Sequence, residues 1–422
     1  MKYEVKEIKK GIKFHTINTH KFKTNLFAIF LSVGLNRENV TKNALVSMLL
    51  RRGSKTMKSQ EEISKKMEEL YGASFDCGLD KTGNNQVLKF YIESINDNYL
   101  PEHNENTLKT VIDSLLEIVF DPYIENEGFK KEYLEQEKNN VRQRIEGKID
   151  NKARYSLERC IEEMYKDEPY GLYKFGYIED LDSINEKKLY EYYIDLINTC
   201  KIDIFLSGNL SEDLDKIIEG NENIKKLKER EPKFEIPKIP EKREIKENII
   251  TESMEVTQGK LVIGLNVNID NDEEKYTTLM YNSILGGSAN SKLFQNVREK
   301  AHLAYVASST YYRFKSIIFI NSGIEISNYD KALELIRKQI EEMKNGNFTE
   351  EEIENSKKGI IAAINTIDDE QDTGITYYFG QELSNSNVSE EEYIKKIENI
   401  NKKDIVDIAN KVQINTIYFL KD

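Results

Sequence analysis

At 422 residues the chain is too long for a single ordinary hydrophobic core, so two or more domains are expected. Apolar residues make up 39% and charged residues 32%, a balance typical of a soluble globular protein. The formal net charge of −13 argues against a general nucleic-acid binder, because such a protein needs a basic face.

Membrane insertion and secretion are not expected. The sequence has no apolar run of about eighteen residues, which a membrane-spanning helix would need. Residues 1–15 have mixed charge and lack the apolar segment of a secretory signal. Three widely spaced cysteines, Cys77, Cys160 and Cys200, indicate neither a disulfide framework nor a zinc ribbon. We therefore expect a cytoplasmic protein.

The first half of the chain mixes strands and helices. Runs of β-branched and apolar residues between turns predict a strand pair, a central strand, a second pair and a closing strand, within 2–19, 23–35, 73–95 and 200–210. Apolar residues at helical spacing predict helices at about 40–54, 59–72, 105–120, 126–148, 152–166 and 183–196. Ser59 and Glu62 form a capping-box pattern at the start of the second helix.

The second half repeats this order of elements. Strands are predicted within 260–269, 303–312, 316–326 and 414–420. Helices are predicted at about 273–287, 291–302, 328–345, 349–366, 372–385 and 402–411. An internal duplication is the simplest explanation of the repeat. The fold class is then α+β, with two tandem domains that each place helices on one face of a mostly antiparallel sheet.

A segment rich in proline and charge separates the halves. Three of the six prolines lie between Pro232 and Pro240, where they remove hydrogen-bond donors and block a helix. We therefore predict domains at 1–228 and 248–422, joined by a linker at 229–247.

Residues 285–312 form a helix-to-strand corner with two suggestive side chains. Gly286 and Gly287 end the preceding helix, which is their ordinary role, although they could also form a flexible loop for extended peptides. Arg298 lies near the end of the next helix and Tyr305 in the strand after it. Without further information, Arg298 is a surface arginine and Tyr305 a half-buried strand tyrosine.

The order of elements and several phrases resemble the M16 (insulinase/pitrilysin-like) zinc peptidases. The segment LGGSANSKLFQNVREKAHLAYVASS looks like the family's C-terminal domain phrase, and QGKLVIGLNV like the strand that opens that domain. The phrase KKMEELYGASFDCGL is most similar to YmfF-type bacterial members, which lack the zinc motif. The resemblance implies M16-type (LuxS/MPP-like) domains that together form half of a clamshell.

The metal ligands of the family are missing from the matching positions. Its H-x-x-E-H motif places the two histidines on Ala44 and Met48 and the glutamate on Ser47, while the distal glutamate ligand falls on Arg144. None of these can bind zinc or act as the general base. The four histidines are scattered over separate segments: His15, His20, His103 and His302. We predict no metal, no cofactor and no catalytic residue in this chain.

Arg298 and Tyr305 fall on the two positions that contact substrate near the zinc in the family. A tyrosine hydroxyl can donate a hydrogen bond to the oxyanion of a peptide-bond intermediate, and an arginine can bind a carbonyl or carboxylate. Neither role needs a metal in the same chain. Extended peptides could also add as strands to edges at 265–270 and 314–323.

The leading hypothesis is therefore a non-catalytic subunit of a heterodimeric M16-like zinc peptidase. It would supply Arg298, Tyr305 and a chamber wall to a paralogue that carries HxxEH and the zinc, and the substrate would be an unfolded or extended peptide. The alternative is a peptide-binding or scaffold protein with no proteolytic role, for example one accessory to translation-factor maturation. A self-sufficient metallopeptidase is disfavoured because no ligands converge.

Overall fold

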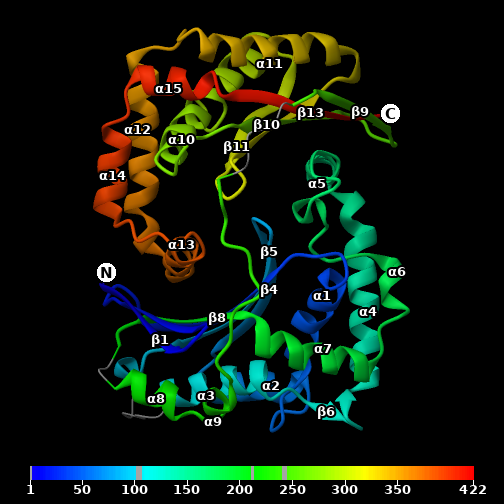
Figure 1. Cartoon of the computed structure of the whole chain (residues 1–422), viewed down its shortest axis with the longest axis vertical. Helices are drawn as coiled ribbons and strands as arrows, with labels where there is room; N and C mark the ends of the chain where they lie inside the picture. The colour runs from blue at the N-terminus through cyan, green and yellow to red at the C-terminus, as the bar shows by residue number, and fades with distance from the viewer. Residues whose placement is uncertain (1, 101–106, 211–212, 240–244) are drawn as a thin grey trace. The chain divides into compact units, whose positions relative to one another are not determined.

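The computed structural model describes residues 2–100, 107–210, 213–239 and 245–422. The chain forms two compact units, and each is discontinuous in sequence (Figure 1). Unit 1 contains Met1–Glu146, Leu172–Ile236 and Ile367–Leu383. Unit 2 contains Gly147–Gly171, Pro237–Thr366 and Ser384–Asp422.

Unit 1 is built on a six-stranded sheet with the strand order β1-β2-β8-β3-β5-β4. Neighbouring strands are antiparallel except β2 and β8, which are parallel. The strands are β1 (Lys2–Lys9), β2 (Ile12–Asn18), β3 (Thr24–Gly34), β4 (Ser74–Thr82), β5 (Asn85–Ile95) and β8 (Lys201–Gly208), and a small separate pair is β6 (Ile124–Glu125) and β7 (Gly128–Phe129). The helices are α1 (Val40–Leu49), α2 (Gln60–Glu69), α3 (Thr107–Phe120), α4 (Lys131–Glu146), α6 (Ile178–Leu181), α7 (Glu186–Thr199), α8 (Leu214–Gly220), α9 (Glu222–Lys226) and α13 (Gln371–Leu383).

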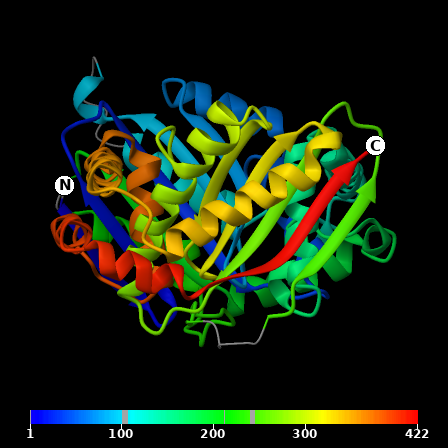
Figure 2. The same cartoon turned by 90° about the horizontal axis from the view of Figure 1, so that it is seen from above.

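Unit 2 is built on a five-stranded sheet with the strand order β11-β12-β10-β13-β9. Among the described strands of this sheet, only β13 and β9 pair in parallel. Figure 2 shows β13 in red beside β9 in green. The strands are β9 (Asn248–Ser253), β10 (Gly259–Val267), β11 (Ala304–Tyr312), β12 (Ile317–Ile324) and β13 (Val412–Lys421). The helices are α5 (Lys152–Met164), α10 (Glu274–Leu285), a π-helix (Phe294–Lys300), α11 (Tyr329–Lys344), α12 (Glu350–Asn365), α14 (Glu390–Glu398) and α15 (Lys402–Ala409).

The central strand of unit 1 is apolar on both faces, as its sequence predicts. Phe27, Ile29 and Leu31 of β3 lie in the main core, in which side chains of α1, α3 and α7 also take part. Phe30 points to the opposite face, where its ring centroid lies 4.8 Å from that of Phe379 in α13. A strand buried on both faces needs a cover on each side, and α13 provides the second cover.

In unit 2, helix α5 covers the second face of the sheet. Leu261, Ile263 and Leu265 of β10 lie in its main core. Val262 points to the other face and packs in a cluster with Cys160 and Ile161 of α5. Each sheet therefore has several helices on one face, and on the other face a helix that comes from the opposite half of the sequence.

The predicted fold class is confirmed: two α+β units follow the predicted order of strands and helices. The predicted domains at 1–228 and 248–422 describe the repeat in sequence order and stay a prediction, because the compact units exchange residues 147–171 and 367–383. Strand β9 and helix α14 were not predicted. The edges expected at 265–270 and 314–323 are wrong, because β10 and β12 have strands on both sides and the true edges of this sheet are β11 and β9.

The first part of the predicted linker is attached to unit 1. The amide of Arg230 donates to the carbonyl of Lys10 at 3.1 Å, and the amide of Gly34 donates to the carbonyl of Lys233 at 2.8 Å. Asn85 exchanges two hydrogen bonds with the backbone of Glu235. Residues 240–244 lie outside the described residues.

Among the helices of the described residues, none is both long enough and apolar enough to cross a bilayer.

A buried polar cluster joins α13 to the sheet of unit 1. Asp203 on β8 is fully buried, with its Oδ1 3.1 Å from Nε2 of His15 and in contact with Nζ of Lys201. Lys201 Nζ also lies 3.2 Å from Oε1 of Glu382 on α13, which accepts from Nζ of Lys13 at 2.7 Å. Opposite charges compensate each other here, which buried charges require.

The contact of α13 with the sheet can be tested with a double-mutant cycle. Phe379→Ala should lower the free energy of unfolding by about 3–5 kcal/mol, because it leaves a cavity between α13 and the sheet. Phe30→Ala should couple to it by about 0.5–1.5 kcal/mol. Denaturant unfolding of the full chain measures both. Thr376→Ala, which substitutes an exposed residue of the same helix, is the control. Purely additive effects of the two Phe substitutions would contradict the packing.

The acid stability of unit 1 should depend on Asp203. Burial alone would raise the pKa of Asp203, but the charge of Lys201 and the hydrogen bond with His15 outweigh it and lower the pKa to about 2. The unfolded chain takes up this proton first as the pH falls, because an unfolded Asp has a pKa of about 3.9. A contribution of about 2 kcal/mol should therefore be present above pH 4 and be lost as the pH falls toward 2.

Denaturant unfolding of the wild type and of Asp203→Asn over this pH range measures that contribution. The difference in free energy between the two proteins should shrink as the pH falls. A difference that stays constant would show that Asp203 keeps an ordinary pKa in the folded chain.

Candidate functional site

The positions of the degenerate zinc motif lie on α1, which is buried along nearly its whole length. Ala44 is fully buried in the main core of unit 1. Ser47 is also buried, and its hydroxyl donates to the carbonyl of Ala44 at 2.9 Å. A short apolar residue and a serine bonded to its own helix leave no metal donor at these positions.

Met48 and Arg144 are brought together, as the family register predicts for positions in one site. Both line a hollow of about 440 Å³ between α1 with its following 3₁₀ turn (Leu50–Arg52), the start of α2, and α4. The other residues that line it are Arg51, Arg52, Gln60, Glu137, Asn140 and Gln143. We call it the cationic hollow, because three of its residues are arginines and one is an acid.

Glu137 is the buried carboxylate of the cationic hollow. It is 2% exposed, contacts Nε of Arg52, and accepts a hydrogen bond from Nδ2 of Asn140 at 3.0 Å. Arg52 thus compensates its charge. Glu137, Arg51 and Arg52 were not predicted from the sequence, although the pair of arginines that begins three residues after Met48 was an available signal.

Zinc does not fit the groups present. Among residues 2–100, 107–210, 213–239 and 245–422, no three His, Cys, Asp or Glu side chains lie together in a way that could hold a metal ion. His15 is a buried core residue between Tyr3 and Asp203, and His20 and His302 are exposed. His103 lies outside the described residues. Three or four convergent ligands are needed for zinc.

In unit 2, Arg298 lies on the π-helix that follows α10. Its guanidinium lies 4.6 Å from the ring centroid of Phe294, and its Nε lies 3.5 Å from the carboxylate of Glu299. The side chain is 43% exposed. π-Helices are rare and frequently lie at functional sites, because the wider turn redirects a side chain. The predicted helix at 291–302 therefore exists in part, with an unexpected geometry.

Tyr305 owes its exposure to a β-bulge in the edge strand β11. Ala304 pairs with Ile324 and Val306 with Gly323, so Tyr305 is the extra residue. Tyr305 and Val306 are consecutive, yet they are 65% and 54% exposed. A bulge breaks the alternation of a strand and redirects its side chains. The expected half-buried strand tyrosine is thus turned into solvent.

Gly286 and Gly287 have a structural role that accounts for both. Gly286 follows the end of α10, and its carbonyl accepts a hydrogen bond from the amide of Ser309 in β11 at 2.9 Å. A Cβ on Gly286 would lie 2.5 Å from Oγ and 2.6 Å from the amide nitrogen of Ser309. A Cβ on Gly287 would lie 2.9 Å from Cα of Ser283. These close approaches favour the helix stop over the flexible loop.

Comparison with known proteins identifies the family. The profile described as "Peptidase M16 inactive domain" matches residues 183–360. The chain is 36% identical over 422 residues to the "Probable inactive metalloprotease YmfF" of Bacillus subtilis, covering 99% of this chain and 97% of that protein. The chain belongs to the M16 peptidase family. The resemblance to inactive, YmfF-type members is thereby confirmed, in agreement with the missing zinc ligands.

Other relatives extend the comparison. The "Uncharacterized zinc protease YmxG" of the same organism is 25% identical over 358 residues, covering 82% of this chain and 80% of that protein. A conserved protein from Enterococcus faecalis superimposes with a TM-score of 0.89 at 28% identity, covering 100% and 99% of the two chains. A peptidase M16 inactive domain from Pseudomonas fluorescens superimposes with a TM-score of 0.80 at 16% identity, covering 100% and 98%, and it shows the fold alone.

The close packing of Gly286 against β11 predicts opposite effects for two glycine substitutions in unit 2. Gly286→Ala should destabilise the protein by about 1–3 kcal/mol, because the added carbon clashes with Ser309. Gly359→Ala, in the exposed middle of α12 where nothing lies within 4 Å of the new carbon, should stabilise it by about 0.5–1 kcal/mol. Denaturant unfolding measures both. If Gly286→Ala leaves the free energy of unfolding unchanged, the segment at Gly286 and Gly287 is free to move, and the flexible-loop interpretation of the two glycines is supported instead.

Proposed function

We propose that this M16 chain is the non-catalytic subunit of a heterodimeric zinc peptidase in the cytoplasm. It would hold an extended peptide and supply Arg298, Tyr305 and part of the chamber wall to a paralogue that carries HxxEH and the zinc. The observation that carries the proposal is a contrast between two sites. The zinc positions hold Ala44, Ser47, Met48 and Arg144, whereas Arg298 and Tyr305 are present and exposed.

The chemistry of the pair fits such a shared site. In peptide hydrolysis an oxyanion develops on the scissile carbonyl, and a phenol hydroxyl can donate a hydrogen bond to it. A guanidinium can bind a neighbouring carbonyl or carboxylate of the same peptide. Zinc and the general base would come from the partner, so Tyr305 and Arg298 would need only to be positioned and open to solvent.

Known relatives support a partner of this kind. Bacillus subtilis contains both a relative named as an inactive metalloprotease and one named as a zinc protease. A cytoplasmic location is supported by the three cysteines, which are all free thiols.

The second candidate is a peptide-holding protein without proteolysis. It is favoured by the exposed pair Tyr305 and Val306 on an edge strand, which could bind an extended peptide without any metal. Co-purification separates the two candidates. A peptide-holding protein would bind unfolded peptides but would not retain a zinc-bearing M16 paralogue.

Mutation of the pair tests the proposed function. The chain is co-expressed with a zinc-bearing M16 paralogue from its own genome, and kcat and KM are measured for cleavage of a fluorogenic peptide. Tyr305→Phe should lower kcat by about 100- to 1000-fold, because it removes a donor to the oxyanion. Arg298→Ala should mainly raise KM, because it removes a contact made in the ground state and the transition state alike.

Arg337→Ala, which changes an arginine of α11 paired with Glu247, is the control and should leave cleavage unchanged. The shared site is excluded if the double variant Arg298→Ala/Tyr305→Phe forms the complex and cleaves as well as the wild type.

A further inference from the structure

The cationic hollow of unit 1 is lined by more positively charged than negatively charged side chains. The chain as a whole carries a formal net charge of −13. Yet the residues that line this hollow include Arg51, Arg52 and Arg144 against the single carboxylate of Glu137. The remaining polar residues, Gln60, Asn140 and Gln143, are neutral amides. A local excess of positive charge in an acidic protein calls for an anion.

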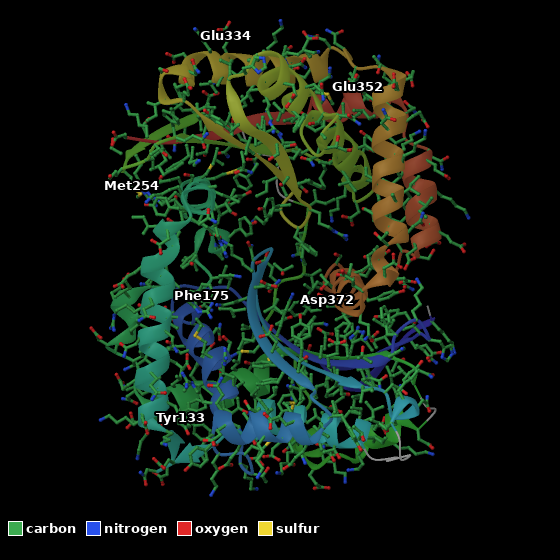
Figure 3. The ribbon with its side chains drawn as sticks, turned by 180° about the vertical axis from the view of Figure 1, so that it is seen from behind. Tyr133, Phe175, Met254, Glu334, Glu352 and Asp372 are labelled. Carbon is green, nitrogen blue, oxygen red and sulfur yellow. The ribbon has the colours of Figure 1, made fainter. Side chains whose placement is uncertain are left out.

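Two of the three guanidinium groups are available to bind it. Arg52 compensates the buried Glu137. Within the part of the chain that the structure describes, neither Arg51 nor Arg144 has an ion pair or hydrogen bond with another side chain. Arg144 instead lies over the ring of Phe175, labelled in Figure 3, with its Cζ 5.4 Å from the ring centroid. This cation–π contact lets the N–H donors of Arg144 reach a ligand, because it uses the face of the ring and no hydrogen bond.

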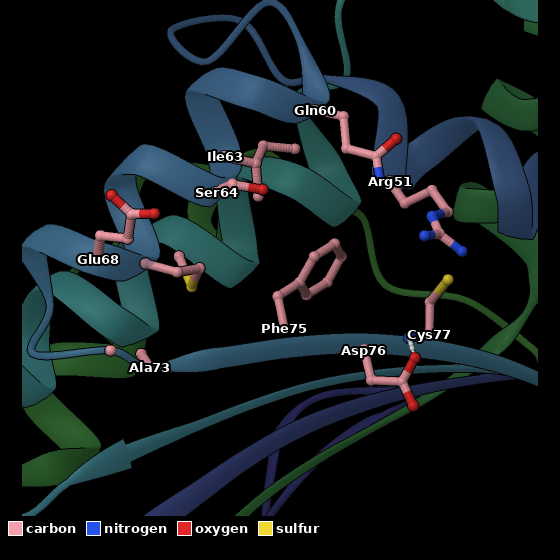
Figure 4. Close-up of a pocket in the computed structure, with 11 residues that line it drawn as sticks. Arg51, Gln60, Ile63, Ser64, Glu68, Ala73, Phe75, Asp76 and Cys77 are labelled. Carbon is pink, nitrogen blue, oxygen red and sulfur yellow. Dashed lines mark hydrogen bonds between the residues drawn. The ribbon is translucent and has the colours of Figure 1, made fainter.

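A second hollow of about 250 Å³ adjoins the first. It shares Arg51 and Gln60 with the cationic hollow and continues to Phe75 and Cys77 on the edge strand β4. Figure 4 shows Arg51 and Gln60 on one side of it and Phe75 and Cys77 on the other. Burial raises the pKa of the Cys77 thiol, and the nearby charge of Arg51 offsets part of that rise. The second hollow has apolar side chains at Ile63, Met67 and Phe75, and it also contains two carboxylates, Glu68 and Asp76. Figure 4 shows Glu68 at the end of this hollow away from Arg51. The hollow thus places apolar contacts beside the guanidinium of Arg51, which both hollows share.

We propose that the cationic hollow binds a carboxylate of a peptide, with Arg51 and Arg144 as the donors and the hollow at Phe75 and Cys77 holding the adjoining chain. Guanidinium groups would then stand at the predicted position of the metal cation of zinc-bearing relatives. They would bind an acidic or chain-terminal part of a peptide, and the peptide would not be cleaved there. The inference rests on the proposed function, since it names the class of peptide that the subunit holds.

The ligand is assigned from the geometry of its donors. The planar fork of an arginine matches the two oxygens of a carboxylate, and charge-assisted bonds of this kind are about twice as strong as neutral ones. A nucleic-acid phosphate is disfavoured because the negative charge of the rest of the chain would repel the polyanion. A peptide carboxylate is a single charge that can enter a hollow of this size.

The test uses the isolated full-length chain, without a partner and without cleavage, so it can fail while the proposed function stands. Fluorescence anisotropy measures the binding of three labelled peptides of otherwise equal sequence. The first has one central glutamate and an amidated C-terminus, the second has glutamine in its place, and the third has glutamine and a free C-terminal carboxyl. Tighter binding of the first assigns the site to acidic side chains, and tighter binding of the third assigns it to chain termini.

The variant Arg51→Gln/Arg144→Gln should weaken the binding of the preferred peptide by about 10- to 100-fold, because two charge-assisted contacts are lost. Its affinity for the second peptide, which has glutamine and an amidated C-terminus, should stay unchanged. Arg142→Gln, on the same helix but outside the hollow, is the matched control and should bind like the wild type. Denaturant unfolding verifies that the variants fold. Equal affinity for all three peptides, or unchanged binding by the double variant, would overturn the proposal.

Discussion

Two sheets with two apolar faces each impose the main constraint on this chain. A strand such as β3, with Phe27 on one face and Phe30 on the other, cannot be stable with one face in water. Unit 1 closes its second face with α13 and unit 2 with α5, and both helices come from the opposite half of the sequence. Neither half of the chain therefore contains a complete core. The two compact units do not coincide with the two halves of the sequence.

The same demand for buried apolar surface applies to the predicted positions of the zinc ligands. Helix α1 is packed on nearly all sides, and Ala44 and Met48, the predicted positions of the two histidine ligands, both contribute apolar contacts to the main core of unit 1. The open side of the same site, at the end of α4, is different. There Arg144 and Arg51 stay accessible to solvent, and Arg52 compensates the buried charge of Glu137. The positions predicted for the metal ligands thus lie beside positively charged side chains.

Much of the fold was readable from the sequence because local patterns determine it. Apolar runs gave the strands, helical spacing gave the helices, and the phrase around Arg298 and Tyr305 gave the family. The parallel pairing of β9 with β13 and the exchange of α5 and α13 were not readable, because a pattern along the chain does not say which face a distant helix covers. The exposure of Tyr305 depends on a single extra residue in β11, which strand alternation cannot predict.

The candidate site was readable only where a motif described it. Ala44, Met48 and Arg144 could be assigned by register, and Met48 and Arg144 do share a hollow. Arg51 and Glu137 could not, because their role arises from three elements that meet only in the folded chain.

The central claim is that Tyr305 contacts a peptide while that peptide is cleaved by a partner. Photo-crosslinking tests it most directly. p-Benzoylphenylalanine replaces Tyr305, and the complex with a zinc-bearing M16 paralogue, freed of metal so that it binds but cannot cleave, is irradiated with a labelled peptide. The account predicts that the label becomes attached to this chain, and that unlabelled peptide abolishes the attachment. Crosslinks that reach only the surface of the partner, with no peptide attached, would contradict it.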